Sequence, residues 1–209
     1  MLSVYNPIKY PQFDRLELDS GIEYTFKVWH SLKPVKKGDI APDFVFEKEG
    51  ARWQQFYNGV ETHGPVLLRQ LLNKTLVLAF YSGSWQDYGL HLLKQLNAIQ
   101  PEIKANDAAL LIISAEKDNK LEKTAWDNNL SLSFYFDTTN AIAEGFGIYS
   151  ENDPVWNRFS GIDTNVPLLA TYLIAPYGRI LYDHIDWDFS GSFPSNDIIS
   201  SVRLQELNR

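Results

Sequence analysis

A short stretch at residues 84–91 holds side chains that could carry acid–base chemistry. Asp87 and His91 are four residues apart, so on a helix they face each other, and a carboxylate beside an imidazole could act as a general acid–base pair. The favoured interpretation is an exposed ion pair near a helix N-terminus. Ser84 lies seven residues before His91, which is too far for the imidazole to activate its hydroxyl, and an N-cap role is favoured instead.

A second group of polar side chains, at residues 183–188, has residue types that bind metals. In an extended strand His184, Asp186 and Asp188 would share one face, and their nitrogen and oxygen atoms suit a divalent ion. The other two histidines considered, His30 and His63, have no ligand partners at a recognisable spacing. The favoured interpretation is a strand end without a metal, and no other cofactor is expected.

The composition excludes several classes of chemistry. The chain of 209 residues contains no cysteine, which excludes disulfides, thiolate catalysis, iron–sulfur clusters and cysteine-based zinc sites. Its net charge of −7 argues against nucleic-acid binding, which requires a basic face. The N-terminus lacks a secretory pattern and no apolar run approaches about 20 residues, so we expect a cytoplasmic protein with no membrane contact.

The elements around the first group form a strand, a turn and a helix. Residues 75–81 are an apolar run that predicts a buried strand, and a Ser-Gly-Ser turn follows it. An apolar stripe at three- and four-residue spacing then predicts a helix over residues 84–104. Backbone N–H groups and the helix dipole at such a junction favour an anion. We therefore expect spare N–H groups over residues 82–89 to hold a small anion.

The remaining pattern alternates strands with helices and predicts an α/β fold with a central mixed sheet sandwiched by helices. Strands are expected at 109–113, 132–136, 171–175 and 179–185, and helices at 120–129, 140–146 and 195–208. Upstream, residues 39–46 form an extended segment with which residues 52–57 could pair as a short hairpin, and residues 66–71 favour one or two helical turns.

The N-terminal region has a different pattern. Residues 15–28 alternate apolar and polar side chains on both sides of a Gly turn, which predicts a β-hairpin. Pro34 and the basic Gly-containing segment after it then break the alternation. We predict an N-terminal extension over residues 1–36 and a main domain over residues 37–209.

Five short segments share their order and motifs with one known family. They are KGDIAPDF at 37–44, FYSGSWQDYG at 80–89, IISA at 112–115, FD at 136–137 with AEGFGI at 143–148, and ATYLI at 170–174 with GRI at 178–180. Together they resemble the peroxiredoxin-like branch of the alkyl hydroperoxide reductase/thiol-specific antioxidant (AhpC/TSA) family. The resemblance covers roughly residues 37–203 and implies a thioredoxin-like (peroxiredoxin) fold.

The resemblance also implies where chemistry would occur. In that family a cysteine thiolate at the helix N-terminus attacks a peroxide, and a second thiol resolves the sulfenic acid. The turn "FYRGSWCPYC" would place its cysteines at Gln86 and Gly89, whereas the Pro-x-x-x-Thr-x-x-Cys form would place its threonine at Gln86 and its cysteine at Gly89. Ser82 occupies the position before the Gly, and Leu169 replaces a family proline, with Pro167 two residues earlier. Under either alignment the reactive sulfur is missing.

The sequence therefore predicts a degenerate peroxiredoxin-like protein without catalytic residues, acting in binding or assembly. Its vestigial active-site positions are Ser82, Gln86 and Gly89, and its predicted binding residues are Ser84, Trp85, Asp87 and His91. A small anion or a protein is the expected partner, and a homodimer follows from the resemblance. Two alternatives remain: an enzyme with cysteine-independent chemistry at the same turn, and a redox accessory that acts with a cysteine-bearing partner.

Overall fold

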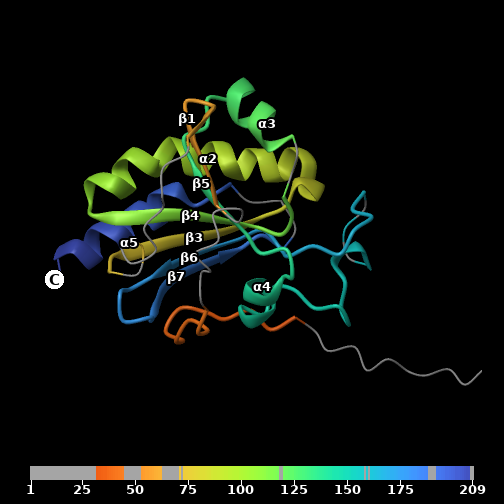
Figure 1. The fold of residues 1–209 in the computed structure, drawn as a ribbon. Coiled ribbons are helices and arrows are strands. Elements are labelled where there is room, and N and C mark those ends of the chain that lie inside the picture. The colour runs from red at the N-terminus through yellow and green to blue at the C-terminus, as the bar shows by residue number, and fades with distance from the viewer. Residues whose placement is uncertain are drawn as a thin grey trace, which may run out of the picture.

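A central mixed sheet organises the chain (Figure 1). The computed structural model describes residues 32–44, 53–62, 71, 73–117, 120–157, 159, 161–187 and 192–207. Within these residues the strands are β1 (Trp53–Tyr57), β2 (Val60–Thr62), β3 (Thr75–Tyr81), β4 (Ala108–Ser114), β5 (Ser133–Phe136), β6 (Ala170–Ile174) and β7 (Ile180–Ile185). They form one sheet in the order β2-β1-β5-β4-β3-β6-β7.

Strands β3, β4 and β5 run parallel in the middle of the sheet, and the flanking strands are antiparallel to their neighbours. All seven residues of β3 are buried, as expected for a strand covered on both faces. Its predicted bounds, 75–81, are confirmed. The expected hairpin of β6 and β7 is also present and completes the sheet on one side.

Helices cover both faces of the sheet. They are α2 (Gln86–Ala105), α3 (Leu121–Asp127), α4 (Ala141–Gly145) and α5 (Ser195–Leu207), with short 3-10 helices η3 (Gly83–Trp85) and η4 (Val155–Asn157). Helices α2 and α5 contact each other and lie against β4, β6 and β7, whereas α4 lies on the opposite side (Figure 1). There Phe146, which follows α4, packs against Phe80 and Tyr172 at ring-centroid distances of 5.1 and 4.9 Å.

The pairing predicted for residues 52–57 is wrong. Strand β1 uses both of its edges, because β2 pairs with one and β5 with the other, so the segment over 39–46 cannot be its partner. Instead Ile40 forms an antiparallel bridge with Arg179, next to β7. The hairpin predicted over residues 15–28 lies outside the described residues, as do His30, His63 and Asp188, and of the turns predicted over 66–71 only Leu71 is described.

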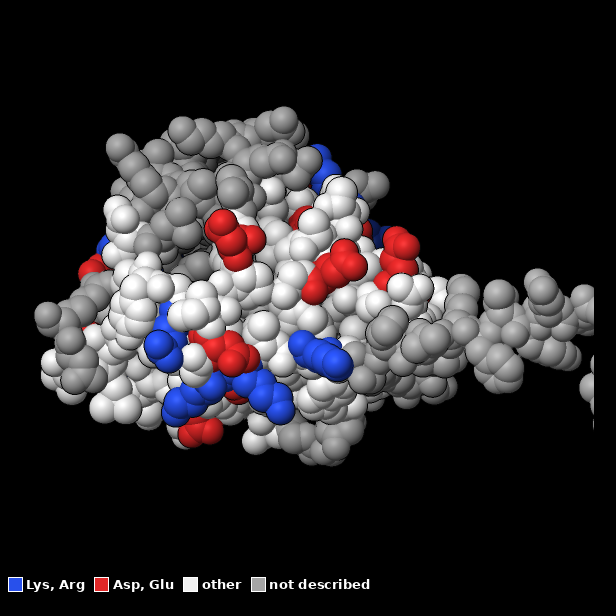
Figure 2. Space-filling view, turned by 90° about the horizontal axis from the view of Figure 1, so that it is seen from below, with Lys and Arg blue, Asp and Glu red and all other residues white. Residues whose placement is uncertain are grey.

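The described segment before β1 follows the β7 side of the domain. Val35 donates its N–H to the Phe146 carbonyl (3.1 Å), and Gly38 donates to Ile180 (2.8 Å). Residues on both sides of the predicted boundary at 36 thus contact the domain, and the boundary itself stays a prediction. On the face seen from below, basic and acidic side chains lie beside one another (Figure 2). Among the described helices, none combines the length and apolar character required to cross a membrane.

Candidate functional site

The turn after β3 begins with a buried serine that caps the next helix. Ser82 has no exposed surface, and its extended backbone aims Oγ at the chain two residues ahead. Oγ accepts a hydrogen bond from the Ser84 N–H (3.0 Å) and donates to Glu116 Oε1 (2.8 Å). The N-cap predicted at Ser84 is therefore wrong, because Ser84 lies inside η3 and Ser82 supplies the capping oxygen.

A carboxylate from elsewhere in the chain occupies the anion position of this turn. Glu116, just beyond β4, also accepts the Gly83 N–H on Oε1 at 2.7 Å. The Trp85 N–H donates to the Ser82 carbonyl, and the Gln86 N–H donates to the Gly83 carbonyl. The N–H groups of residues 83–86 are thus all satisfied within the chain. The expectation of spare donors is wrong at these residues, because Glu116 and the 3-10 turn use them.

The first vestigial position, Gln86, is exposed and has a strained backbone. Its φ of 50° and ψ of −123° fall in a region that glycine adopts readily and other residues rarely. Such a conformation costs on the order of 1–3 kcal/mol and persists only when the surrounding structure imposes it. The side chain makes one long contact, from Nε2 to the Gly161 carbonyl at 3.5 Å. A side chain at this position is therefore open to solvent.

The second vestigial position, Gly89, is sterically closed. It lies buried in the first turn of α2, where a Cβ atom would come within 2.9 Å of Tyr81 Cε2 and 3.0 Å of the Ser82 carbonyl oxygen. Real Cβ atoms essentially never approach other heavy atoms so closely, because protein interiors are tightly packed. Glycine therefore allows the helix to lie directly on the end of β3.

Trp85 belongs to the core and not to a binding surface. Its side chain has no exposed area, its Nε1–H donates to the Pro167 carbonyl at 2.8 Å, and its ring packs edge-on against Phe159 at 5.1 Å. A buried indole usually finds such a partner for its N–H. The predicted contact of Trp85 with a ligand is therefore corrected to a structural role.

Asp87 and His91 are both exposed on α2 but do not form the expected pair. The Nε2 atom of His91 lies 3.4 Å from Nε2 of Gln95, one turn further along the helix. Among the ion pairs of the described residues there is none between Asp87 and His91. The sequence spacing permits the contact, but His91 forms a contact with Gln95 instead.

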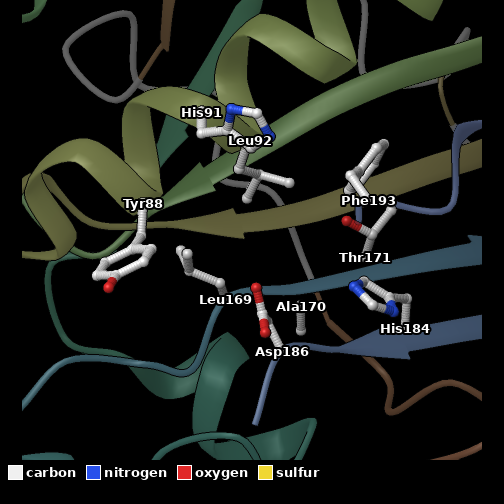
Figure 3. Close-up of a pocket in the computed structure, with 9 residues that line it drawn as sticks. All are labelled: Tyr88, His91, Leu92, Leu169, Ala170, Thr171, His184, Asp186 and Phe193. Atoms are coloured by element: carbon white, nitrogen blue, oxygen red, sulfur yellow. The ribbon is translucent and has the colours of Figure 1, made fainter. Parts of the chain in front are cut away.

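A cavity beside the turn is lined by residues from both polar segments identified in the sequence, residues 84–91 and residues 183–188. It has a volume of about 240 Å³, and its lining residues are Tyr88, His91, Leu92, Leu169, Ala170, Thr171, His184, Asp186 and Phe193. Figure 3 shows α2 on one side of it and β6 and β7 on the other. Thr171 and His184 are cross-strand partners, so their side chains share the face that α2 covers. We call this space the α2–β7 cavity.

Two of the three residues considered as metal ligands, His184 and Asp186, line the cavity, and the third, Asp188, lies outside the described residues. Within the described part of the chain, no three His, Asp or Glu side chains lie close enough to hold a metal ion. Asp183 belongs to the other side of β7, where its Oδ1 accepts the Lys37 N–H at 2.7 Å. Asp183 is thus kept away from His184 and Asp186, because neighbouring side chains of a strand point to opposite faces.

His184 makes the free energy of unfolding depend on pH. Burial lowers the pKa of its imidazole below 6.5, although Asp186 and Asp183 act in the opposite direction. The unfolded chain therefore binds this proton more readily than the folded protein. This contribution to stability is present above about pH 6.5 and is lost as the pH falls from there through the folded-state pKa.

We expect the free energy of unfolding to decrease as the pH is lowered through about 6.5, with a smaller decrease in the variant His184→Gln. Urea unfolding at several values between about pH 7.5 and pH 5.5 measures both slopes. The exposed His91, changed to Gln, serves as a control for loss of a histidine. Equal slopes in the wild type and His184→Gln would contradict the assignment.

Comparisons with known proteins give one family match and several solved structures with a similar fold. The model of the AhpC/TSA family matches residues 37–183. Peroxidoxin BcpB from Mycobacterium tuberculosis is 19% identical with a TM-score of 0.57, and the match covers 81% of this chain and 97% of that chain. Reduced 2-Cys peroxiredoxin from Plasmodium vivax is 16% identical with a TM-score of 0.56, covering 83% and 98%.

AhpC from Enterococcus faecalis is 12% identical with a TM-score of 0.56, and that match covers 82% of this chain and 93% of that chain. No curated protein matches the sequence. Identities at this level carry information about the fold alone. With the observed sheet, they confirm the predicted α/β thioredoxin-like (peroxiredoxin) fold.

Proposed function

Because the chain belongs to the AhpC/TSA family but contains no cysteine, we propose that it is a non-catalytic family member that keeps the fold for binding or assembly. The missing cysteine is the observation that carries this proposal. Peroxide reduction in this family's manner requires a thiolate that becomes a sulfenic acid. The only sulfur atom in the chain belongs to Met1, and a thioether does not perform this reaction.

The geometry of the turn supports the same proposal. Gln86 occupies one vestigial position with a strained backbone, and the other, Gly89, has no room for a side chain. Glu116 takes the hydrogen-bond donor of Gly83, which a bound anion would otherwise use. A reaction at this turn would require its internal contacts to open first.

The alternatives receive less support. Cysteine-independent catalysis at the turn would require an activated group. Among the described residues, no base is hydrogen-bonded to the Ser84 hydroxyl, and no ion pair joins Asp87 to His91. No contact of the described residues favours a redox accessory over a binding protein. A homodimer and a protein partner remain part of the proposal, and analytical ultracentrifugation of the full chain tests the first of them.

We expect the purified full chain to consume hydrogen peroxide no faster than buffer when dithiothreitol, or thioredoxin with its reductase, supplies electrons. The physical reason is the lack of a sulfur nucleophile at either vestigial position. Loss of peroxide is followed colorimetrically, and the oxidation of NADPH is followed in the coupled assay. A cysteine-containing peroxiredoxin provides the positive control.

Thiol-dependent turnover that scales with protein concentration and survives a metal chelator would overturn the proposal. The variant Gln86→Cys is informative in the same assay because its thiol would be exposed. We expect this thiol to react with a thiol reagent but not to support peroxide turnover, since the turn around it remains bound to Glu116.

A further inference from the structure

We propose that the α2–β7 cavity binds a small organic cation, a primary amine on a compact apolar body. This inference rests on the proposed binding role and names a site and a ligand class for it. The cavity is separate from the vestigial turn, since neither Gln86 nor Gly89 lines it. Four observations support it: an unpartnered hydroxyl, the charge of the lining, its apolar walls and its size.

The first observation is the buried hydroxyl of Thr171. The residue is 1% exposed, and its Oγ1 has no hydrogen-bond partner among the described residues. Figure 3 shows this oxygen directed toward the interior of the cavity. Leaving a buried hydroxyl unsatisfied destabilises the folded protein. Valine would fill nearly the same volume in this apolar strand without that cost, whereas a ligand N–H would satisfy the hydroxyl.

The second observation is the charge around the cavity. Asp186 contributes a carboxylate to the lining, and Figure 3 shows it extending into the space beneath α2. Burial lowers the pKa of His184 and favours its neutral form. Among the lining residues that the structure describes, none is Lys or Arg. Lys33 and Lys36 lie in a neighbouring groove. The resulting potential favours a cation over an anion.

The third and fourth observations concern the walls and the size. Leu92, Leu169 and Phe193 provide apolar surface for the body of a ligand. Tyr88, which is 55% exposed, lines the cavity too and presents an aromatic ring that could contact an ammonium group. The volume of about 240 Å³ is slightly smaller than the range of about 300–1,000 Å³ found for drug-sized ligands. A one-ring amine therefore suits the cavity better than a nucleotide or a long chain.

Three probes of one shape but different charge test this inference on the full chain. Phenethylamine is the cation, 2-phenylethanol the neutral analogue and 3-phenylpropionate the anion. We expect chemical-shift titration to show saturable binding of phenethylamine at signals from α2, β6 and β7. The alcohol should bind at least about tenfold more weakly, and the acid should not saturate, since a charge-assisted hydrogen bond is stronger than a neutral one.

Variants locate the binding at the cavity. Asp186→Asn should weaken phenethylamine binding at least about tenfold, and Thr171→Val should weaken it by about two- to tenfold, as expected for loss of a charged and a neutral hydrogen bond. Thr171→Ser keeps the hydroxyl and should retain most of the affinity. Asp163→Asn, an exposed change of the same charge outside the cavity, should leave binding unchanged. Circular dichroism verifies that each variant is folded.

Equal binding of the three probes, absence of saturation by phenethylamine, or unchanged affinity in Asp186→Asn and Thr171→Val would overturn the inference. The last result would mean that water alone satisfies the Thr171 hydroxyl. These outcomes are distinguishable from failure of the proposed function. Peroxide turnover would refute the non-catalytic role whatever the probes do, and loss of amine binding without turnover would refute only the ligand class.

Discussion

Replacing Gly89 with alanine is expected to lower the free energy of unfolding by about 1–3 kcal/mol, the usual cost of overpacking a filled interior. In the interior of an exposed helix the same change normally stabilises by about 0.5–1 kcal/mol. Here the new methyl group would meet the Tyr81 ring at 2.9 Å and the Ser82 carbonyl at 3.0 Å. Both neighbours are buried, so neither can move without disturbing the end of β3. Equilibrium unfolding in urea measures the difference.

Gly145, in α4, provides the matched control. Its nearest neighbour for an added Cβ is Pro42 Cβ at 3.4 Å, an ordinary van der Waals contact. We expect Gly145→Ala to change stability by no more than about 1 kcal/mol. A Gly89→Ala protein as stable as the wild type would mean that the helix does not approach β3 as closely as described. Gly89→Val should be less stable than Gly89→Ala, because its two further methyl groups meet the same neighbours.

Replacing Glu116 with alanine is expected to destabilise the protein by about 2–4 kcal/mol. The change removes the acceptor for the buried Ser82 hydroxyl and the half-buried Gly83 N–H. A polar group left unsatisfied in a buried place costs about 1–3 kcal/mol, and the partly exposed N–H adds less. Ser82 has no exposed surface, so water cannot reach its hydroxyl without opening the turn. Thermal and urea unfolding provide the measurement.

Acetate supplies a sharper test of the same contact. In Glu116→Ala we expect added acetate to restore stability in a concentration-dependent way, because an anion that binds only the folded state stabilises it by mass action. The wild type should show no comparable response. Glu122→Ala, which removes an exposed carboxylate of α3, controls for general effects of charge. Unchanged stability in Glu116→Ala would show that the carboxylate does not hold the turn.

The elements of the fold could be predicted where the local pattern is strong. The seven-residue run of β3 and the apolar stripe of α2 each extend over enough residues to specify one structure. The partner of β1 could not be predicted, since its sequence WQQFY has no feature that distinguishes one neighbouring strand from another. Pairing with β2 and β5 depends on how the whole sheet assembles, which lies beyond any local window.

The candidate site was only partly accessible from the sequence. The turn and its missing sulfur are visible in the residue order, but the capping role of Ser82 depends on Glu116, 34 residues away. His91 and His184 line the same α2–β7 cavity because α2 crosses the hairpin of β6 and β7, and the residue order does not reveal this crossing. One sequence signal could have pointed to the cavity. In the strand ATYLI, which is buried throughout, Thr171 is an aliphatic residue that carries a hydroxyl group.

Glu116 acts as an intramolecular ligand of the turn, because its carboxylate accepts hydrogen bonds from Ser82 and Gly83. Because it is part of the chain, its carboxylate competes with dissolved anions at an effective concentration that does not fall on dilution, typically millimolar or higher for closely linked groups. A dissolved anion well below that concentration therefore cannot displace it from Ser82 and Gly83. The donors that the turn could offer to a dissolved anion are therefore used by a carboxylate of the chain itself.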